Sequence, residues 1–181
     1  MRGLKAIFCM ALVLCADPTA NAKDEPEYSR KAKLLLTLLP YVQWRSQATW
    51  GDGPFQIAVL GKSEFGPHLN NQVGALTIHH RQIRVRYVSK PGDAEGCQAL
   101  FICASEAPRI ESILAWAKGR PILTLSDDEA MARRGVMINL LMDGSFVRMV
   151  VNPETAAMAG LFLGSEIQAN ARIIAMKRAP S

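Results

Sequence analysis

Three short runs of apolar residues, each followed by a helix-like stretch, constrain the fold of this chain more than any other feature. Phe55–Gly61, Ala99–Cys103 and Pro121–Leu125 are apolar at most positions rather than at alternate ones. Strands of this kind are buried on both faces, as in the centre of a parallel sheet covered by helices. The alternation of strands and helices predicts a single α/β domain, with a mixed, mostly parallel sheet of about six strands flanked by helices.

The first predicted helix spans Glu27–Leu39, where leucines recur every three or four residues. Three of its cations, Arg30, Lys31 and Lys33, are expected to lie toward solvent. Pro40 should end or kink the helix, because proline lacks the backbone donor and restricts the residue before it. Further helices are expected around 64–73 and at 108–118.

One strand has the alternating pattern of a half-buried position in a sheet. Residues Gln82–Val88 alternate between apolar and mostly cationic side chains. The pattern places Ile83, Val85 and Tyr87 inward, and Arg84 and Arg86 outward.

An antiparallel hairpin is predicted near the end of the chain. Asp143-Gly144 joins two strand-like segments, Val136–Met142 and Ser145–Val151, and this dipeptide is the strongest short hairpin signal. Asn152-Pro153 then predicts a helix start, with asparagine as the N-cap and proline at the first helical position.

Two segments have the spacing of capping boxes, in which a serine and a residue three positions later satisfy each other's backbone donors. Ser126–Glu129 is expected to open a short helix that stops at Gly135, and Ser165–Gln168 a final helix that runs to about Ala175.

The first residues have the three parts of a secretory signal peptide. Arg2 and Lys5 precede an apolar run from Ala6 to Ala16, and Ala20-Asn21-Ala22 provides the small-residue exit. A stable membrane span would need about 20 apolar residues. We therefore expect a cleaved leader at 1–22, a short flexible start at 23–27, the α/β domain at 28–175 and a disordered tail at 176–181; an uncleaved anchor is the alternative.

The charge balance favours acidic partners only mildly. The chain carries a net charge of +5, which suits an acidic protein surface or an anionic membrane. An exported protein rarely meets nucleic acid, so we expect no nucleic-acid partner.

Residues typical of catalysis do not gather in any recognised motif, and we expect a protein that is not an enzyme. Gly61-Lys62-Ser63 resembles the end of a phosphate-binding loop, but Gln56 stands where the motif needs its first glycine. Asp127, Asp128 and Glu129 could serve as catalytic carboxylates, but helix capping already explains them.

No metal site, cofactor or disulfide is expected either. His79 and His80 are adjacent on or near a strand, so they should point to opposite faces rather than share a metal. Cys97 and Cys103 are separated by extended chain of roughly 20 Å, at about 3.3 Å per residue, whereas a disulfide needs Cα atoms within about 7 Å. We expect two buried thiols, with pairing only if Cys97 lies in a loop that folds back.

Two pairs of arginines are the residues we expect to contact a partner. Arg84 and Arg86 share the outward face of their strand, and Arg133 and Arg134 end a short helix. Such cations speed association with an acidic partner and set its specificity. The alternative is that both pairs are simply solvated.

Residues 28 to 175 resemble the YfiR-like family of bacterial periplasmic proteins. An opening helix that leads to Tyr41–Trp44 is similar to the family's aromatic-x-x-Trp ending, although Arg45 replaces the usual proline. The other matching segments, in order along the chain, are Phe55–Gly61, Ile83–Arg86, Gly96–Ile102, Pro121–Asp127, Gly135–Leu140, Val151-Asn152 and Ala159–Leu161.

The resemblance implies a periplasmic regulator that binds and represses the sensor region of an inner-membrane signalling protein. The best-known members restrain a diguanylate cyclase, and so affect cyclic-di-GMP and biofilm growth. An outer-membrane lipoprotein can sequester them, and dimers are known. A small-molecule-binding sensor module is the alternative, because clefts at the strand ends of α/β sheets commonly hold ligands.

Overall fold

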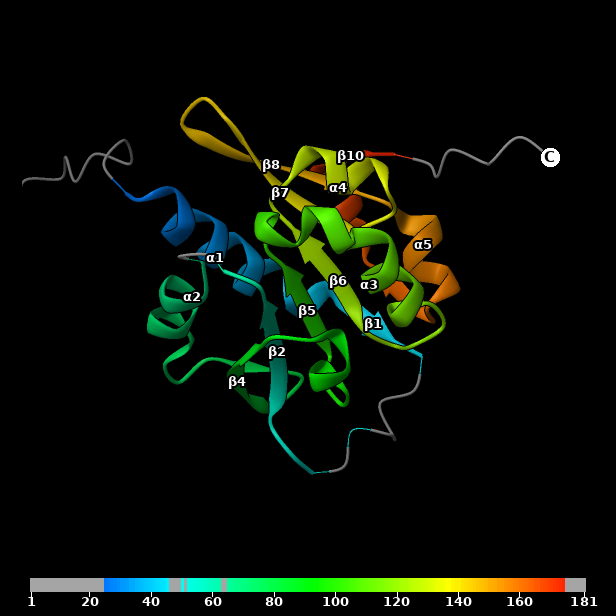
Figure 1. Cartoon of the computed structure of the whole chain (residues 1–181). Coiled ribbons are helices and arrows are strands. Elements are labelled where there is room, and N and C mark those ends of the chain that lie inside the picture. Colours follow the sequence, from blue (N-terminus) through cyan, green and yellow to red (C-terminus); the bar gives the residue numbers. More distant parts are fainter. Residues whose placement is uncertain (1–24, 46–49, 51, 63–64, 175–181) are drawn as a thin grey trace, which may run out of the picture.

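An eight-stranded sheet runs through the middle of the molecule and organises the rest of the chain (Figure 1). This computed structural model describes residues 25–174 except 46–49, 51 and 63–64. The expected leader and tail lie outside the described residues. The strand order is β10-β8-β7-β6-β5-β2-β4-β3. Neighbouring strands are parallel except in the β7–β8 and β3–β4 pairs, so the predicted mostly parallel α/β domain is confirmed.

The apolar runs form the centre of the sheet, as predicted. They are β2 (Phe55–Leu60), β5 (Ala99–Ile102) and β6 (Leu123–Ser126), and all their residues are buried except the half-buried Gln56. β4 (Arg81–Val88) lies beside β2, and Gly61 turns the chain out of β2 with a φ of 96°.

Helices cover both faces of the sheet, and each face has its own apolar core. α1 (Glu27–Leu38) and α2 (Phe65–Val73) pack on one face, where Phe65 stacks on Phe101 with ring centroids 3.7 Å apart. α3 (Ile110–Ala117) and α4 (Glu129–Arg133) pack on the other face. Short 3-10 helices lie at Leu39–Tyr41, Pro91–Ala94 and Ala104–Arg109.

The predicted hairpin forms between β7 (Ile138–Asp143) and β8 (Phe146–Val151), but its two-residue turn is Gly144-Ser145 rather than Asp143-Gly144, because Asp143 still pairs with Phe146. Figure 1 shows that its tip projects beyond the rest of the sheet. Asn152 caps α5 (Pro153–Met158) by accepting a hydrogen bond from the Thr155 amide at 3.0 Å.

The prediction of about six strands is too low, because short strands carry little periodicity. β3 (Thr77–Ile78) and β10 (Ala171–Ile173) add the edges of the main sheet. β1 (Val42–Trp44) and β9 (Leu161–Leu163) form a separate antiparallel pair. The predicted final helix is also wrong: α6 (Ser165–Ala169) has only five residues, because the chain then joins the sheet as β10 beside β8.

Both predicted capping boxes are wrong in detail. Asp128, not Ser126, is the N-cap of α4, because Ser126 still belongs to β6. The Asp128 carboxylate accepts hydrogen bonds from the amides of Ala130 and Met131 at 2.7 and 3.1 Å. In α6 the N-cap is Gly164, with no side-chain capping hydrogen bond.

Two side chains, one in α1 and one in β4, differ in exposure from the prediction. Lys31 is buried rather than exposed. Tyr87 lies on the predicted face, against Gly66 of α2, where a Cβ atom would come within 2.3 Å of its ring, but the residue is 59% exposed rather than buried. Because position 66 is a glycine, the ring can lie against α2 at this point.

Candidate binding groove

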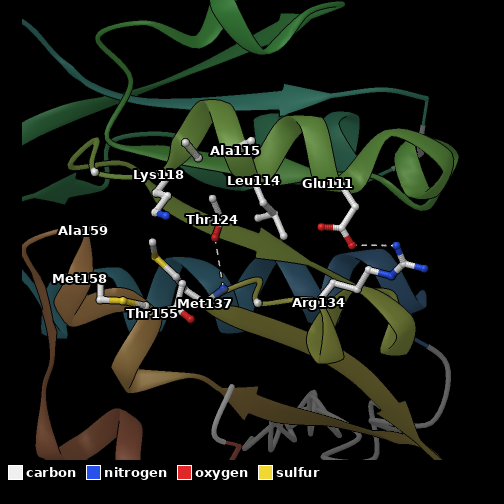
Figure 2. Close-up of a pocket in the computed structure, with 13 residues that line it drawn as sticks. Glu111, Leu114, Ala115, Lys118, Thr124, Arg134, Met137, Thr155, Met158 and Ala159 are labelled. Atoms are coloured by element: carbon white, nitrogen blue, oxygen red, sulfur yellow. Dashed lines mark hydrogen bonds and ion pairs between the residues drawn. The ribbon is translucent and has the colours of Figure 1, made fainter. Parts of the chain in front are cut away.

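A half-open groove of about 400 Å³ lies between α3 and α5, above the first residues of β6 and the loop into β7 (Figure 2). Its walls are mainly apolar, and include Leu114 of α3, Met137 before β7 and Met158 of α5. This volume lies within the range of about 300–1,000 Å³ that is usual for small-molecule sites.

Small residues leave the space that forms the groove. Ala115 and Gly119 line the α3 side, and Gly135 and Ala159 line the opposite side. The amphipathic pattern of α3 directs Ile110, Ile113 and Ala117 toward the core, and Leu114 is the one large apolar side chain of α3 that lines the groove. The groove therefore follows from the local sequence of two helices that meet over one strand.

Charged groups occupy the two ends of the groove. Arg134 and Glu111 form an ion pair at 2.9 Å across one end. Lys118, at the C-terminal end of α3, lies at the other, and Figure 2 shows its side chain extending from α3 toward α5. No ion pair to Lys118 forms within the described part of the chain.

Two threonine hydroxyls also line the groove. Thr124 Oγ1 accepts a hydrogen bond from the Met137 amide at 3.2 Å, which leaves its proton available to a second acceptor. Thr155 Oγ1 is buried and has no hydrogen-bond partner among the described residues. Mainly apolar walls with a few polar groups are typical of small-molecule sites.

The four arginines predicted to contact a partner do not come together. Arg84 and Arg86 lie on β4, whereas Arg133 and Arg134 lie at the end of α4, next to β7. Between β4 and β7 lie β2, β5 and β6. At about 4.8 Å per strand, the two pairs are on the order of 20 Å apart.

Three of these arginines are engaged within the domain. Arg86 donates to Gln56 Oε1 at 3.1 Å and to the Asp93 carbonyl at 2.9 Å. Arg133 pairs with Glu129 at 2.7 Å, and Arg134 with Glu111. Arg84 is exposed, and within the described residues no hydrogen bond or ion pair is formed by its side chain.

A buried charge cluster was missed by the sequence analysis. Lys31 of α1 is 2% exposed, and its Nζ lies 3.1 Å from Asp127 Oδ2, just after β6. Lys31 also pairs with Glu27 one turn earlier in α1 and lies over the ring of Tyr28, 5.2 Å from its centroid. The cluster therefore joins α1 to the carboxyl end of the sheet.

The charges of this cluster depend on one another. Burial alone would lower the pKa of Lys31, but the carboxylates of Glu27 and Asp127 outweigh it and raise this pKa above the ordinary 10.5. The signal that could have revealed the cluster is helical spacing, since Lys31 lies four residues before Leu35 and seven before Leu38, on the apolar face.

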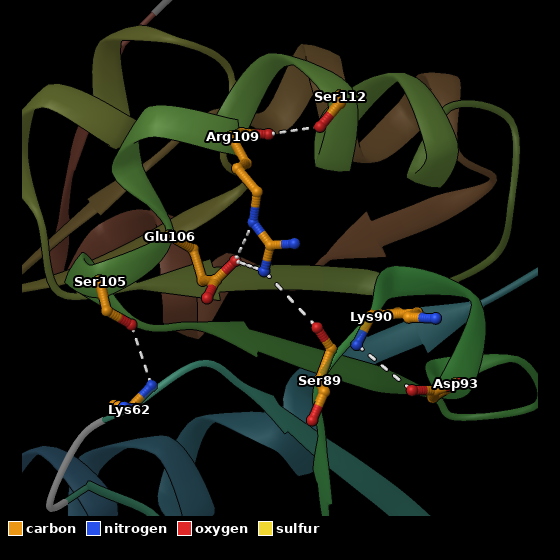
Figure 3. A network of polar contacts seen from close by, with 8 residues as sticks. All are labelled: Lys62, Ser89, Lys90, Asp93, Ser105, Glu106, Arg109 and Ser112. Carbon is orange, nitrogen blue, oxygen red and sulfur yellow. Dashed lines mark hydrogen bonds and ion pairs between the residues drawn. The ribbon is translucent and has the colours of Figure 1, made fainter.

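A second polar network closes the carboxyl ends of β2, β4 and β5, where the strand order reverses (Figure 3). The Lys62 amide donates to Ser105 Oγ at 2.9 Å. Glu106, 7% exposed, accepts from Arg109 Nε at 2.9 Å. Such switch points often bind ligands, but here these side chains pair with one another.

The residues considered for metal and thiol chemistry are separated. Within the described ranges, no group of three or more His, Cys, Asp or Glu side chains could hold a metal ion. His79 and His80 form the left-handed turn between β3 and β4, with φ of 48° and 63°. Cys97 and Cys103 are both buried and are not joined in a disulfide. Burial raises the pKa of the Cys97 thiol, and Arg86 partly opposes this effect.

The fold and the groove define the class of protein: a one-domain α/β protein with a mostly parallel sheet and a half-open apolar site beside it. Its sequence matches the YfiR/HmsC-like family over residues 28–172, and the chain belongs to that family. The family is one of periplasmic regulators rather than known enzymes, which supports a regulatory role. No curated protein matches the sequence.

Solved structures share the fold at low sequence identity. A conserved domain protein from Vibrio cholerae O1 biovar El Tor has 14% identity and a TM-score of 0.58, and covers 83% of this chain. An ABC domain in complex with L-Trp, from Streptococcus pneumonia, has 13% identity and a TM-score of 0.53, and covers 82%. The chain spans 60% of the length of each. In the described residues, no helix is long and apolar enough to cross a membrane.

Proposed function

We propose that the protein is exported to the periplasm and represses an inner-membrane signalling protein, most specifically a diguanylate cyclase, by binding its periplasmic sensor region. The observation that carries this proposal is the family match over residues 28–172. Such a repressor must bind the inactive form of its partner more tightly than the active form. Sequestration by an outer-membrane lipoprotein and formation of a homodimer belong to the same proposal.

Arg84 is the residue of the predicted set that is best placed to contact an acidic partner. Its side chain is exposed on β4, next to the edge strand β3, and Arg86 two residues later adds a second positive charge. Arg133 and Arg134 are each paired to a glutamate of this chain, so they would have to exchange that partner on binding.

The test is direct association of this protein with the periplasmic sensor region of a membrane-bound diguanylate cyclase from the same cell, measured by biolayer interferometry. We expect micromolar or tighter binding, weakened in Arg84→Glu. Arg172→Glu is the matched control, because Arg172 is an exposed arginine on the opposite edge of the sheet, in β10. Absence of binding to every such sensor region would refute the repressor role.

A second candidate function is a small-molecule sensor, which is favoured by the groove between α3 and α5. The fold it shares with the L-Trp complex from Streptococcus pneumonia is consistent with this role. A thermal-shift screen of periplasmic metabolites, without any partner protein, tests it: a rise of several degrees in Tm supports a sensor.

A further inference from the structure

We infer that the groove between α3 and α5 binds a small amphipathic carboxylate with a saturated alkyl chain, of about the size of octanoate. The carboxylate pairs with Lys118, and the chain lies along the groove toward the Glu111–Arg134 pair. This inference rests on the second proposed function, the small-molecule sensor, and names the class of its ligand. The inference does not depend on the repressor role.

The charge of the ligand follows from the ends of the groove. At one end, the guanidinium of Arg134 is already neutralised by Glu111, 2.9 Å away. At the other end, Lys118 sits at the C-terminus of α3, and no ion pair to it forms among the described side chains. An unpaired cation beside apolar walls favours a ligand with one negative charge, because an ammonium forms a charge-assisted hydrogen bond with a carboxylate.

The alkyl character of the ligand follows from the walls. Leu114, Met137 and Met158 line the groove, and none of its described lining residues is aromatic, so nothing there would select a planar ring by stacking. Methionine side chains are flexible and adapt to a chain of variable shape. Met158 is 59% exposed, so its burial under a ligand would remove apolar surface from water.

The length of the ligand follows from α3. The groove runs along this helix from Glu111 to Lys118, which at about 1.5 Å per residue is roughly 10 Å. A medium-length chain spans this distance, whereas a longer one would pass the Glu111–Arg134 pair and meet water.

Titration calorimetry on protein produced from the full-length gene tests the inference, with octanoate, hexanoate and octylamine as probes below their aggregation limits. We expect saturable binding of one octanoate, about fourfold tighter than hexanoate. This ratio corresponds to half of the binding free energy that full burial of two methylene groups would give. Octylamine should not bind. Lys118→Glu should weaken octanoate binding by about tenfold or more. Lys62→Glu, which changes an exposed lysine after β2 that does not line the groove, should leave it unchanged.

Spectra with 13C-methyl methionine locate the site. Octanoate should shift the Met137 and Met158 signals and leave that of Met149, which is buried in the core, unchanged. No binding at millimolar octanoate, equal binding of octylamine, or full affinity in Lys118→Glu would overturn the inference. A hit from another chemical class in the thermal-shift screen would then leave the sensor candidate standing, and the repressor role is decided separately by the partner assay.

Discussion

Asp127→Asn should destabilise the fold far more than the same substitution at the adjacent Asp128. The Asp127 side chain is 7% exposed, and its Oδ2 lies 3.1 Å from the Nζ of Lys31, whose side chain is 3% exposed. Asparagine keeps the size of aspartate and removes its charge. Lys31 would then remain buried with Glu27 as its only carboxylate partner in the described chain.

The magnitude follows from the burial of the pair. Removing one partner of a buried ion pair costs about 3–5 kcal/mol of unfolding free energy. Because Glu27 still pairs with Lys31 and is itself about half exposed, we expect the lower end, about 3 kcal/mol. Asp128 acts instead as the N-cap of α4. Asparagine caps helices as well as aspartate does, so Asp128→Asn should cost less than about 0.5 kcal/mol.

Urea unfolding at pH 7, followed by circular dichroism and tryptophan fluorescence, measures both losses under identical conditions. The double variant Lys31→Met/Asp127→Asn should recover at least about 1 kcal/mol relative to the sum of its single variants, because the two residues interact directly. If Asp127→Asn and Asp128→Asn lose the same stability, the ion pair does not hold α1 to the sheet, and the reasoning is refuted.

Four further outcomes are expected. Gly61→Ala should lower the unfolding free energy by about 2 kcal/mol or more, since its φ is 96° and a Cβ would lie 2.6 Å from Ser105 Oγ; an unchanged Tm would contradict this. Asn152→Ala should cost about 1 kcal/mol as a lost N-cap, checked by urea unfolding. Cys97 should react with a thiol reagent at pH 8 far more slowly in the folded than in the unfolded protein, since burial raises its pKa; equal rates would argue against it. The pKa of Lys31 is raised, so the stability that its charge contributes is complete below its ordinary pKa of 10.5 and is lost as the pH rises through the higher pKa of the folded state. Between neutral and strongly basic pH, Lys31→Met should therefore lose less unfolding free energy than the unsubstituted protein.

The central fold could be predicted because its signals are local. The apolar runs of β2, β5 and β6, the hairpin between β7 and β8, and the Asn152 cap each depend on a few consecutive residues. Each forms as expected, with the hairpin turn displaced by one residue. Short strands that are stabilised mainly by pairing with a distant strand could not be predicted in the same way. β1 and β9 have three residues each and pair across more than a hundred positions of sequence, so neither has a pattern of its own.

The groove was missed for a related reason. Its lining residues come from α3, α5, β6 and the loop before β7, and most are alanine, glycine or methionine, which no binding motif singles out. A cavity is defined by what the surrounding side chains leave unfilled, and this depends on how two helices dock on one strand. The prediction that Arg134 faces a partner likewise could not anticipate Glu111, which reaches it from another helix.

Lys31 shows how a local rule fails when the deciding contact is distant. A lysine in an exposed-looking helix is normally solvated, because burying its ammonium without a partner is unfavourable. Here the helix periodicity itself places Lys31 among the leucines of the apolar face, and the partner that makes this arrangement tolerable lies 96 positions later, at Asp127. The aspartate follows directly after a central strand, where the sheet brings it to α1. A lysine on the apolar face of a helix therefore predicts a buried counter-charge elsewhere in the chain. Here that counter-charge is Asp127, which pairs with Lys31, whereas Asp128 caps α4.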